Sequence, residues 1–167
     1  MAALETIVIP GTTLNPTRIA LGTWAIGGWM WGGTDEAESI RTIRSAVDRG
    51  INLIDKAPAY GFGHSEEIAG EALAEIGRDK VLVATKVGLD WREGQPFRNA
   101  SRARIHKEIE DSLRRLRTDV IDIYQGPDPN TPIEETAQAM AELHQVGKIR
   151  AIGASNFSTD RCVRFAR

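Results

Sequence analysis

Short runs of apolar residues alternate along the chain with longer stretches whose apolar positions recur every three or four residues. Runs of the first kind are typical of strands buried on both faces, and stretches of the second kind of amphipathic helices. The predicted strands are residues 19–21, 52–55, 81–85, 120–124 and 149–153. Because parallel strands need a crossover connection, usually a helix, this alternation predicts an α/β fold with parallel strands.

Each amphipathic stretch begins near a residue that can cap or start a helix, and several end at a glycine. Serine and threonine caps supply a side-chain oxygen to the free N–H groups of the first turn, and proline suits the first helical position. The predicted helices are residues 35–49 before Gly50, a helix capped by Ser65 and ended by Gly77, a helix capped by Ser101, a helix opened by Thr131 and Pro132 that ends near Gly147, and a helix from about Thr159 or Asp160.

The stretch before the first predicted core strand has the pattern of a small β-hairpin. Residues 5–9 and the stretch through Leu14 flank the turn formers Pro10 and Gly11. No linker or low-complexity segment follows, so residues 1–167 are expected to form one domain. Strand–helix units of about thirty residues fit either an open doubly wound sheet or a (β/α)8 barrel, and periodicity does not choose between them.

The composition is that of an ordinary soluble domain, with 26% charged and 41% hydrophobic residues and a formal net charge of -2. No block of lysine and arginine stands clear of acidic neighbours, which argues against a nucleic-acid surface. Cys162 is the only cysteine and cannot form an internal disulfide. Without a leader at Met1 or a run of about 18 apolar residues, we expect neither membrane insertion nor export, and therefore a cytoplasmic location.

Polar residues that could carry chemistry follow the predicted strands. Asp55 and Tyr60 follow the second strand, and Lys86 follows the third. A buried Asp and Lys at neighbouring strand ends would pair, because an unpaired charge among apolar walls is costly. A tyrosine beside that lysine would have its pKa lowered toward the range of a general acid. The other interpretation is a strand-end ion pair with a loop tyrosine packed on it, and spacing leaves both open.

Five ordered runs resemble the aldo-keto reductases over essentially the whole chain. They are GTW at 22–24, NLIDKAPAYGFGHSE at 52–66, VLVATKVGL at 81–89, DVIDIYQ at 119–125 and IRAIGASNFS at 149–158. The resemblance implies a (β/α)8 barrel whose bottom is closed by the N-terminal hairpin. It also implies NADPH as cofactor and hydride transfer to the carbonyl group of a small aldehyde or ketone.

The resemblance further implies roles for individual residues. Tyr60 would be the general acid that protonates the carbonyl oxygen, Lys86 would lower its pKa, and Asp55 would orient Lys86. The cofactor-binding residues implied are Gly22, Thr23, Trp24, Ser155 and Asn156. Ser155 and Asn156 match positions that hold the nicotinamide carboxamide, and Trp24 lies where relatives line the mouth of the active site.

The chain departs from the family pattern after the fourth strand. In the family, a histidine follows this strand and orients the substrate carbonyl, whereas here residues 125–129 read QGPDP, about two residues shorter and without histidine. His64 is expected in the loop before the second helix, and His106 and His144 within helices. No ligand spacing joins them, so we expect no metal site. The departure predicts impaired turnover.

Lys56 is a second departure, because relatives usually carry a small polar residue beside the catalytic Asp. Its ammonium group could compete with Lys86 for Asp55 and weaken the arrangement around Tyr60. Equally, Lys56 could face solvent, since neighbouring strand residues point to opposite faces.

The third departure is length, because a (β/α)8 barrel takes about 250 residues and five strands are visible here. Five units would leave two strand edges and apolar surface uncovered. We therefore expect a homo-oligomer or a complementary fragment to cover the edges, and weak cofactor binding. The alternative function is a non-catalytic partial-barrel module that keeps the strand ends because the scaffold needs them.

Overall fold

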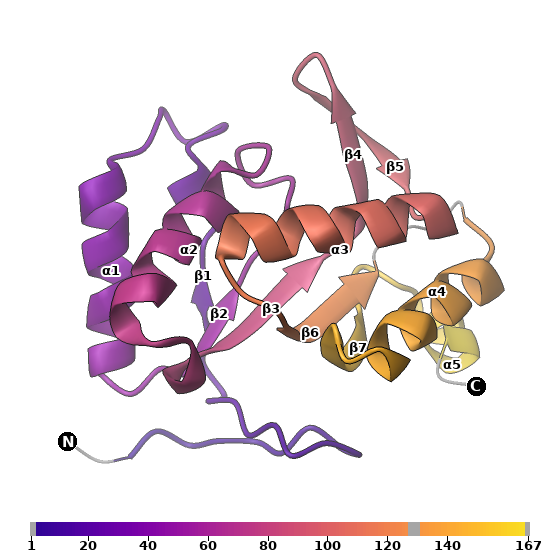
Figure 1. Cartoon of the computed structure of the whole chain (residues 1–167), viewed down its shortest axis with the longest axis horizontal. Coiled ribbons are helices and arrows are strands. Elements are labelled where there is room, and N and C mark those ends of the chain that lie inside the picture. The colour runs from indigo at the N-terminus through magenta and orange to yellow at the C-terminus, as the bar shows by residue number, and fades with distance from the viewer. Residues whose placement is uncertain (1–2, 127–130, 166–167) are drawn as a thin grey trace.

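The computed structural model describes residues 3–126 and 131–165 and shows a parallel sheet flanked by helices (Figure 1). In this part of the chain five strands form the sheet, in the order β1-β2-β3-β6-β7, and all neighbours are parallel. They are β1 (Leu21–Gly22), β2 (Leu53–Asp55), β3 (Leu82–Lys86), β6 (Ile121–Gly126) and β7 (Ile149–Ala154). The spatial order follows the chain without reversal, whereas a doubly wound sheet reverses at a switch point. The sheet therefore has the order of a (β/α)8 barrel.

A helix follows each strand of the sheet, and the first four lie in the crossover connections to the next strand. The helices are α1 (Glu36–Asp48), α2 (His64–Ile76), α3 (Arg102–Leu116), α4 (Ile133–Gln145) and α5 (Thr159–Phe165), with short 3-10 helices at η1 (Ala25–Gly27) and η2 (Arg78–Lys80). Consecutive α-helices pack side by side. The predicted α/β fold of about five barrel units is confirmed. No helix in the described ranges is long and apolar enough to cross a membrane.

One predicted helix cap, Ser101, is confirmed, and Asp35, predicted as the first residue of its helix, is the N-cap of α1. The Asp35 side chain accepts a hydrogen bond from the N–H of Glu38 at 2.8 Å, and Ser101 accepts one from the N–H of Arg104 at 3.4 Å. Ser65 is not a cap, because Gly63 occupies that position with a φ of 102° and starts α2 earlier. His64 is therefore the first residue of α2 and not part of the preceding loop. The hydroxyl of Ser65 is buried and donates to the carbonyl oxygen of Thr23.

The start of α4 also differs from the prediction. Pro132 is the N-cap residue and makes no side-chain cap hydrogen bond, so the helix begins one residue later than predicted. The Thr131 hydroxyl accepts a hydrogen bond from the N–H of Ala100, which directly precedes the Ser101 cap. It therefore links the starts of α3 and α4 instead of capping α4.

The predicted N-terminal hairpin is present. Thr6 pairs with Thr17 in an antiparallel bridge, and the N–H of Ile7 donates to the carbonyl oxygen of Pro16 at 2.9 Å. Asn52, just before β2, accepts from the N–H of Thr17 at 2.7 Å. This contact ties the hairpin to the amino ends of the strands, at the bottom of Figure 1.

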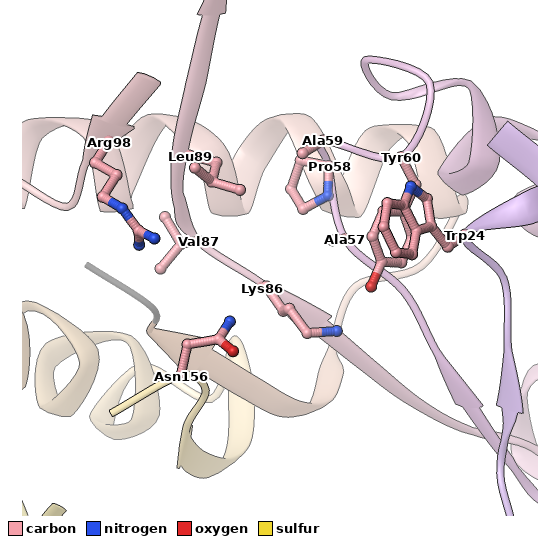
Figure 2. A pocket seen from close by; sticks show the side chains of 10 residues that line it. All are labelled: Trp24, Ala57, Pro58, Ala59, Tyr60, Lys86, Val87, Leu89, Arg98 and Asn156. Carbon is pink, nitrogen blue, oxygen red and sulfur yellow. The ribbon is translucent and has the colours of Figure 1, made fainter. Parts of the chain in front are cut away.

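A second hairpin, between β3 and α3, was not predicted. Its strands β4 (Gly88–Arg92) and β5 (Gln95–Asn99) pair antiparallel around a loop of Glu93 and Gly94, whose φ angles are 53° and 75°. Positive φ at both loop residues gives the tight turn that suits a two-residue hairpin. Leu89 of β4 and Arg98 of β5 line one pocket with Lys86 at the end of β3 (Figure 2).

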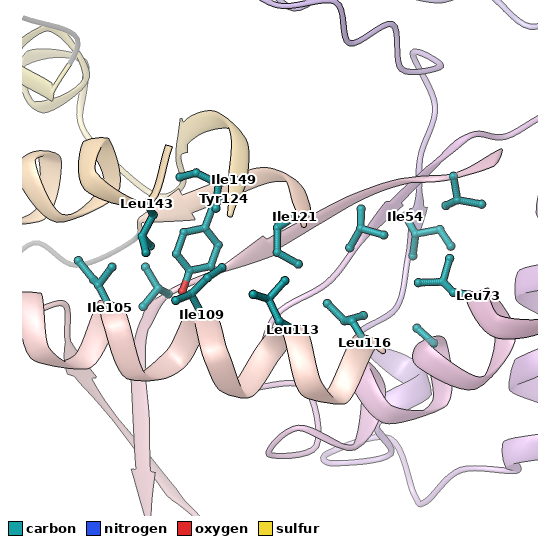
Figure 3. Packing of buried hydrophobic residues seen from close by; sticks show 14 of the residues in the cluster. Ile54, Leu73, Ile105, Ile109, Leu113, Leu116, Ile121, Tyr124, Leu143 and Ile149 are labelled. Atoms are coloured by element: carbon teal, nitrogen blue, oxygen red, sulfur yellow. The ribbon is translucent and has the colours of Figure 1, made fainter. Parts of the chain in front are cut away.

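The hydrophobic core lies between the sheet and the helices (Figure 3). One stripe of α3 faces the sheet and packs over the side chains of Ile54, Ile121 and Tyr124, all fully buried. The stripe consists of Ile105, Ile109, Leu113 and Leu116. Burying a large aliphatic side chain contributes roughly 1.5–3 kcal/mol, so this layer holds the strand ends in place.

A buried ionic cluster joins α2, β3 and α3 behind the strand ends. Glu66 is fully buried and accepts hydrogen bonds from Thr85 at 2.7 Å and from Arg115 at 2.7 Å. Arg115 also pairs with buried Glu108, which in turn pairs with Arg104. Because buried charges are tolerated only when paired, this cluster fixes the packing of the two helices against β3.

Candidate active site

Asp55 and Lys86 meet at the carboxyl ends of two neighbouring parallel strands. The Lys86 Nζ donates to Asp55 Oδ1 at 2.8 Å and Oδ2 at 2.9 Å, and to the backbone oxygen of Lys56 at 2.8 Å. The side chains are 16% and 35% exposed, Lys86 being the more buried. An ammonium group has three protons, so these three acceptors match its capacity and fix its position.

Tyr60 lies beside this pair, as the sequence predicts. The Lys86 Nζ is 5.4 Å from the centroid of the Tyr60 ring. On the ring, Trp24 stacks with a centroid distance of 5.9 Å and an interplanar angle of 19°, and Trp31 meets Trp24 edge-on at 6.0 Å. The structure therefore brings Asp55, Tyr60 and Lys86 together and packs the phenol ring against an indole.

The backbone of Tyr60 is held by a close approach that only glycine allows. A Cβ atom added to Gly27 would lie 2.5 Å from the carbonyl carbon of Tyr60 and 2.6 Å from its oxygen. Gly61, with a φ of 66°, faces the carbonyl oxygen of Gly27 from the other side. The loop after β1 thus sets the position of the loop that carries Tyr60.

A pocket of about 230 Å³ opens over these residues. Its lining comes from the loops after β1, β2, β3 and β7 and from the β4–β5 hairpin (Figure 2). The lining residues are Trp24, Ala57, Pro58, Ala59, Tyr60, Lys86, Val87, Leu89, Arg98 and Asn156. Most of them are apolar, which is typical of a small-molecule site with a few oriented polar groups.

Asn156 and Ser155 lie at the β7 side of this pocket. Asn156 belongs to the lining, and its Nδ2 donates to the Oγ of Ser155 at 3.3 Å. An amide and a hydroxyl offer both donors and acceptors, which is the chemistry that a carboxamide needs. Their part in cofactor binding stays a prediction.

The other two predicted cofactor residues, Gly22 and Thr23, lie at the end of β1 and outside the pocket lining. Thr23 is fully buried, and its hydroxyl donates to the backbone oxygen of Asp55 at 3.0 Å and accepts from Lys56 at 3.3 Å and Ser65 at 3.1 Å. The Thr23 side chain is thus committed to the interior behind the strand ends. A cofactor contact by either residue stays a prediction.

Lys56 is fully buried, so the solvent-facing alternative is wrong. Among the described residues its ammonium makes one hydrogen bond, to Thr23 at 3.3 Å, and Lys86 takes both oxygens of Asp55. Burial lowers the pKa of Lys56 from 10.5 to about 7, although the negative charges of Glu66 and Asp55 oppose this shift. Lys56 therefore does not displace Lys86 from Asp55.

The end of β6 contributes Gln125, whose Nε2 lies 3.4 Å from Oδ1 of Asp55. The segment that follows includes residues 127–130, which fall outside the described part of the chain. His64 pairs with Glu36 and Glu67 and His106 with Glu142, and His144 is exposed near the end of α4. None of the three histidines lines the pocket, and the described residues hold no group of three or more His, Cys, Asp or Glu suited to a metal ion.

Leu89 and Arg98 are pocket residues that sequence reasoning missed. They reach the pocket because they are directly paired across the β4–β5 hairpin. The available signal was Glu93–Gly94 between two five-residue runs, a dipeptide that suits a two-residue turn. Without it, residues 88–99 read as a polar loop.

One family model matches most of the chain. The model described as "Aldo/keto reductase family" matches residues 18–166. The chain belongs to the aldo/keto reductase family. This family-model match agrees with the barrel order of the strands and with the polar residues found at their carboxyl ends.

Two curated relatives show how far the family likeness extends. "Aldo-keto reductase YhdN" of Bacillus subtilis is 61% identical over 165 residues, covering 97% of this chain and 50% of the relative. "NADH-specific methylglyoxal reductase" of Escherichia coli is 44% identical over 174 residues, covering 94% of this chain and 53% of the relative. This aldo/keto reductase chain thus spans about half the length of the relatives it matches.

Solved structures agree on the fold. The glycerol dehydrogenase AKR11B4 from Gluconobacter oxydans matches with a TM-score of 0.89 and 56% identity, over 97% of this chain and 51% of that one. The aldo-keto reductase AKR11C1 from Bacillus halodurans, in a holo form, matches with a TM-score of 0.87 and 32% identity, over 97% and 53%. The five units of this chain therefore superimpose on about half of an aldo/keto reductase.

Proposed function

We propose that the site reduces small aldehydes or ketones to alcohols with NADPH as the hydride donor. The observation that carries the proposal is that Tyr60 and Lys86 line one pocket while Asp55 holds Lys86 through two hydrogen bonds. Membership of an oxidoreductase family supports the reaction type. The cofactor, when bound, supplies the hydride that adds to the carbonyl carbon.

The residues of the chain supply the proton and its control. Tyr60 donates its hydroxyl proton to the carbonyl oxygen, and the Lys86 ammonium beside the ring stabilises the phenolate that remains. Asp55 holds Lys86 in place through two hydrogen bonds. The apolar walls formed by Val87, Leu89 and their neighbours exclude water, which strengthens these electrostatic effects.

Ser155 and Asn156 would hold the carboxamide of the nicotinamide ring, since their hydroxyl and amide groups lie together at the pocket. The choice of NADPH over NADH rests on the family resemblance, and one relative is named as NADH-specific. Competition between the two cofactors therefore belongs to the test.

We further propose that turnover is slow. Residues 126–130, which directly follow Gln125, include no histidine, so the donor toward the carbonyl oxygen that the family resemblance implies at this place is missing. Loss of one donor to a developing oxyanion typically costs about 10²–10³ in rate. The remaining proton donor is Tyr60.

Association is the last part of the proposal. β1 and β7 are the edges of the described sheet, and the backbone groups of an edge strand can pair with a strand of another chain. A second copy or a complementary fragment would pair with these edges, and the molar mass in solution would show it. A strictly monomeric molar mass for the purified chain would contradict pairing with a second copy. A cytoplasmic location stays a prediction.

The test combines binding and turnover. NADPH and NADH are titrated while the tryptophan fluorescence is recorded, because Trp24 lines the pocket. Butanal is then added and loss of the reduced nicotinamide absorbance is followed for the wild type and Tyr60→Phe. We expect saturable quenching by NADPH in both proteins, slow turnover in the wild type and none in Tyr60→Phe. Absence of saturable binding, or equal turnover in both proteins, would overturn the proposal.

A further inference from the structure

A tight turn of residues 28–31 carries two tryptophans. The N–H of Trp31 donates to the carbonyl oxygen of Gly28 at 3.0 Å, and φ is positive at Met30, at 66°, but not at Trp29. This is the geometry of a type II turn, whose third residue is usually glycine or asparagine. A methionine with a positive φ is strained, and such strain persists only where the surrounding structure enforces it. The contacts of the turn therefore offset this strain.

The turn brings its two tryptophans against different rings. Trp29 packs on Phe62 with a centroid distance of 5.1 Å, while Trp31 meets Trp24 at 6.0 Å with an interplanar angle of 76°. An edge-to-face arrangement of this kind is favoured because the positive edge of one ring meets the negative face of the other. The turn thus contacts the Tyr60 loop directly at Phe62, and it contacts the Tyr60 ring indirectly, through Trp24.

The backbone and the ring of Tyr60 are held by different contacts. The backbone is fixed by the close approach of Gly27 and by Phe62, which has a φ of 57° and packs between two indoles. The ring packs on Trp24 at 5.9 Å with an interplanar angle of 19°, and the Lys86 Nζ lies 5.4 Å from its centroid (Figure 2). Because the ring carries the phenol hydroxyl, its contact with Trp24 sets where that hydroxyl lies relative to Lys86.

Trp24 is only half-buried and needs support of its own. Its side chain is 46% exposed, and that of Trp31 is 56% exposed. Exposed side chains change rotamer within picoseconds to nanoseconds unless packing prevents it. Trp31 packs on the Trp24 ring, whereas the pocket lining includes Trp24 and not Trp31. Trp31 therefore restricts the ring on which Tyr60 stacks, and it does so without being part of the pocket wall.

We propose that Trp31 is a positioning residue for carbonyl reduction, which holds Trp24 against the Tyr60 ring and so keeps the phenol hydroxyl beside Lys86. This inference rests on the proposed function for the reaction and adds a residue that acts on Tyr60 through Trp24. Loss of the Trp31 ring leaves the Tyr60 backbone held by Gly27 and loosens the ring alone. Proton donation by Tyr60 therefore slows while the cofactor still binds.

The first test observes the Tyr60 ring without turnover. The chain has two tyrosines, and Tyr124 is fully buried, so the full chain labelled with carbon-13 at the tyrosine ring gives two sets of NMR signals, which Tyr60→Phe assigns. The stacked indole displaces the Tyr60 signals from the position of free tyrosine. In Trp31→Ala we expect them to move toward that position while the Tyr124 signals stay. Met30→Ala removes the neighbouring exposed side chain and is the matched control, which should leave both sets in place.

The second test measures kcat for butanal with saturating NADPH, in water and in heavy water. We expect kcat of Trp31→Ala to fall at least about tenfold, since a misplaced reacting group can cost about 10² in rate. The solvent isotope effect on kcat should rise, because proton donation becomes more limiting. Trp31→Phe keeps a ring against Trp24 and should restore most of the lost rate. The dissociation constant for NADPH, read from the cofactor's own emission, should stay within about threefold.

The outcomes separate the two proposals. Unmoved Tyr60 signals in Trp31→Ala, or moved signals with an unchanged kcat, would overturn the role of Trp31 and leave carbonyl reduction standing. Weaker NADPH binding with an unchanged kcat would assign Trp31 to the cofactor site and also overturn the inference. Equal effects of Met30→Ala and Trp31→Ala would refute a specific role of the Trp31 ring. No turnover by the wild type, with Tyr60 signals that move in Trp31→Ala, would refute the reductase proposal and support the hold of Trp31 on Tyr60.

Discussion

Two neighbouring regions at the end of β2 each hold a lysine, and the two lysines differ in the hydrogen-bond acceptors around them. On the pocket side, Lys86 has three hydrogen-bond acceptors, two of them on Asp55. On the helix side, Lys56 is fully buried and has one, Thr23 at 3.3 Å. Asp55 and Lys56 are adjacent, so a single step along the strand separates a paired charge from a poorly paired one. The fold therefore compensates the charge of Lys86 well and that of Lys56 poorly.

The environment of Lys56 explains its lowered pKa. Transfer of an ammonium group into the interior is costly unless opposite charges and hydrogen bonds compensate. Glu66 is near enough to attract Lys56, but its oxygens accept from Thr85, Ser112 and Arg115. We therefore expect Lys56 to lower the free energy of unfolding, while the Asp55–Lys86 pair serves the pocket.

The largest effect is expected from Lys86→Met, which leaves Asp55 without its cation and removes the charge beside Tyr60. The rate kcat/KM for butanal reduction should fall by about 10²–10⁴, because proton donation by Tyr60 loses its support. Lys80→Met, at an exposed lysine in η2, is the control. A Lys86→Met variant with activity within threefold of the wild type would remove Lys86 from the mechanism.

Lys56→Met should stabilise the folded chain, whereas Lys86→Met should reduce the rate. Methionine fills similar space without a charge, and the free energy of unfolding at pH 7 should rise by about 3 kcal/mol, since the amine pKa lies well below its ordinary value. Urea unfolding of Lys56→Met and Lys80→Met measures the difference. A destabilised Lys56→Met protein would show that the buried amine contributes more than its desolvation costs.

The free energy of unfolding should also depend on pH because of Lys56. The folded pKa of Lys56 is about 7 and its unfolded value is 10.5, so between these values the unfolded state binds more protons. The stability of the wild type relative to Lys56→Met should therefore increase by about 1.4 kcal/mol per pH unit from pH 7 upward, and be constant below pH 7. A stability difference that does not change between pH 7 and 9.5 would mean that Lys56 stays protonated in the folded chain.

Thr23→Val should give the smallest effect. It removes the acceptor of Lys56 and the donor to the backbone oxygen of Asp55, and should cost about 1–2 kcal/mol in the free energy of unfolding. In the Lys56→Met background this cost should shrink by about 0.5–1 kcal/mol, because one of the lost hydrogen bonds is already absent. Equal costs in both backgrounds would show that Thr23 and Lys56 do not interact.

The strands and the three candidate catalytic residues at their ends could be predicted from the sequence. Strands buried on both faces read as apolar runs, and Asp55, Tyr60 and Lys86 stand where such strands end. The order of the strands in space was not predictable from periodicity, since both sheet types share the same units. In the structure, the sheet strands pair in parallel and in the order in which they occur along the chain, which is the order of a (β/α)8 barrel.

The missed features depend on geometry that no local pattern expresses. Lys56 is charged, yet strand alternation and the covering helix place it in the interior. Ser65 was misjudged because Gly63 provides the positive φ that starts α2. Arg98 reaches the pocket only through the register of the β4–β5 hairpin, which a two-residue loop determines.

The central claim is that Asp55, Tyr60 and Lys86 converge to reduce a carbonyl group. The most direct measurement is isotope transfer: the chain is incubated with butanal and NADPH that carries deuterium at both C4 positions of the nicotinamide ring, and the butanol is analysed by mass spectrometry. The account predicts deuterium on the carbinol carbon with the wild type and at least roughly a hundredfold less with Tyr60→Phe. Unlabelled butanol or no butanol from the wild type, or equal labelling by both proteins, would contradict it.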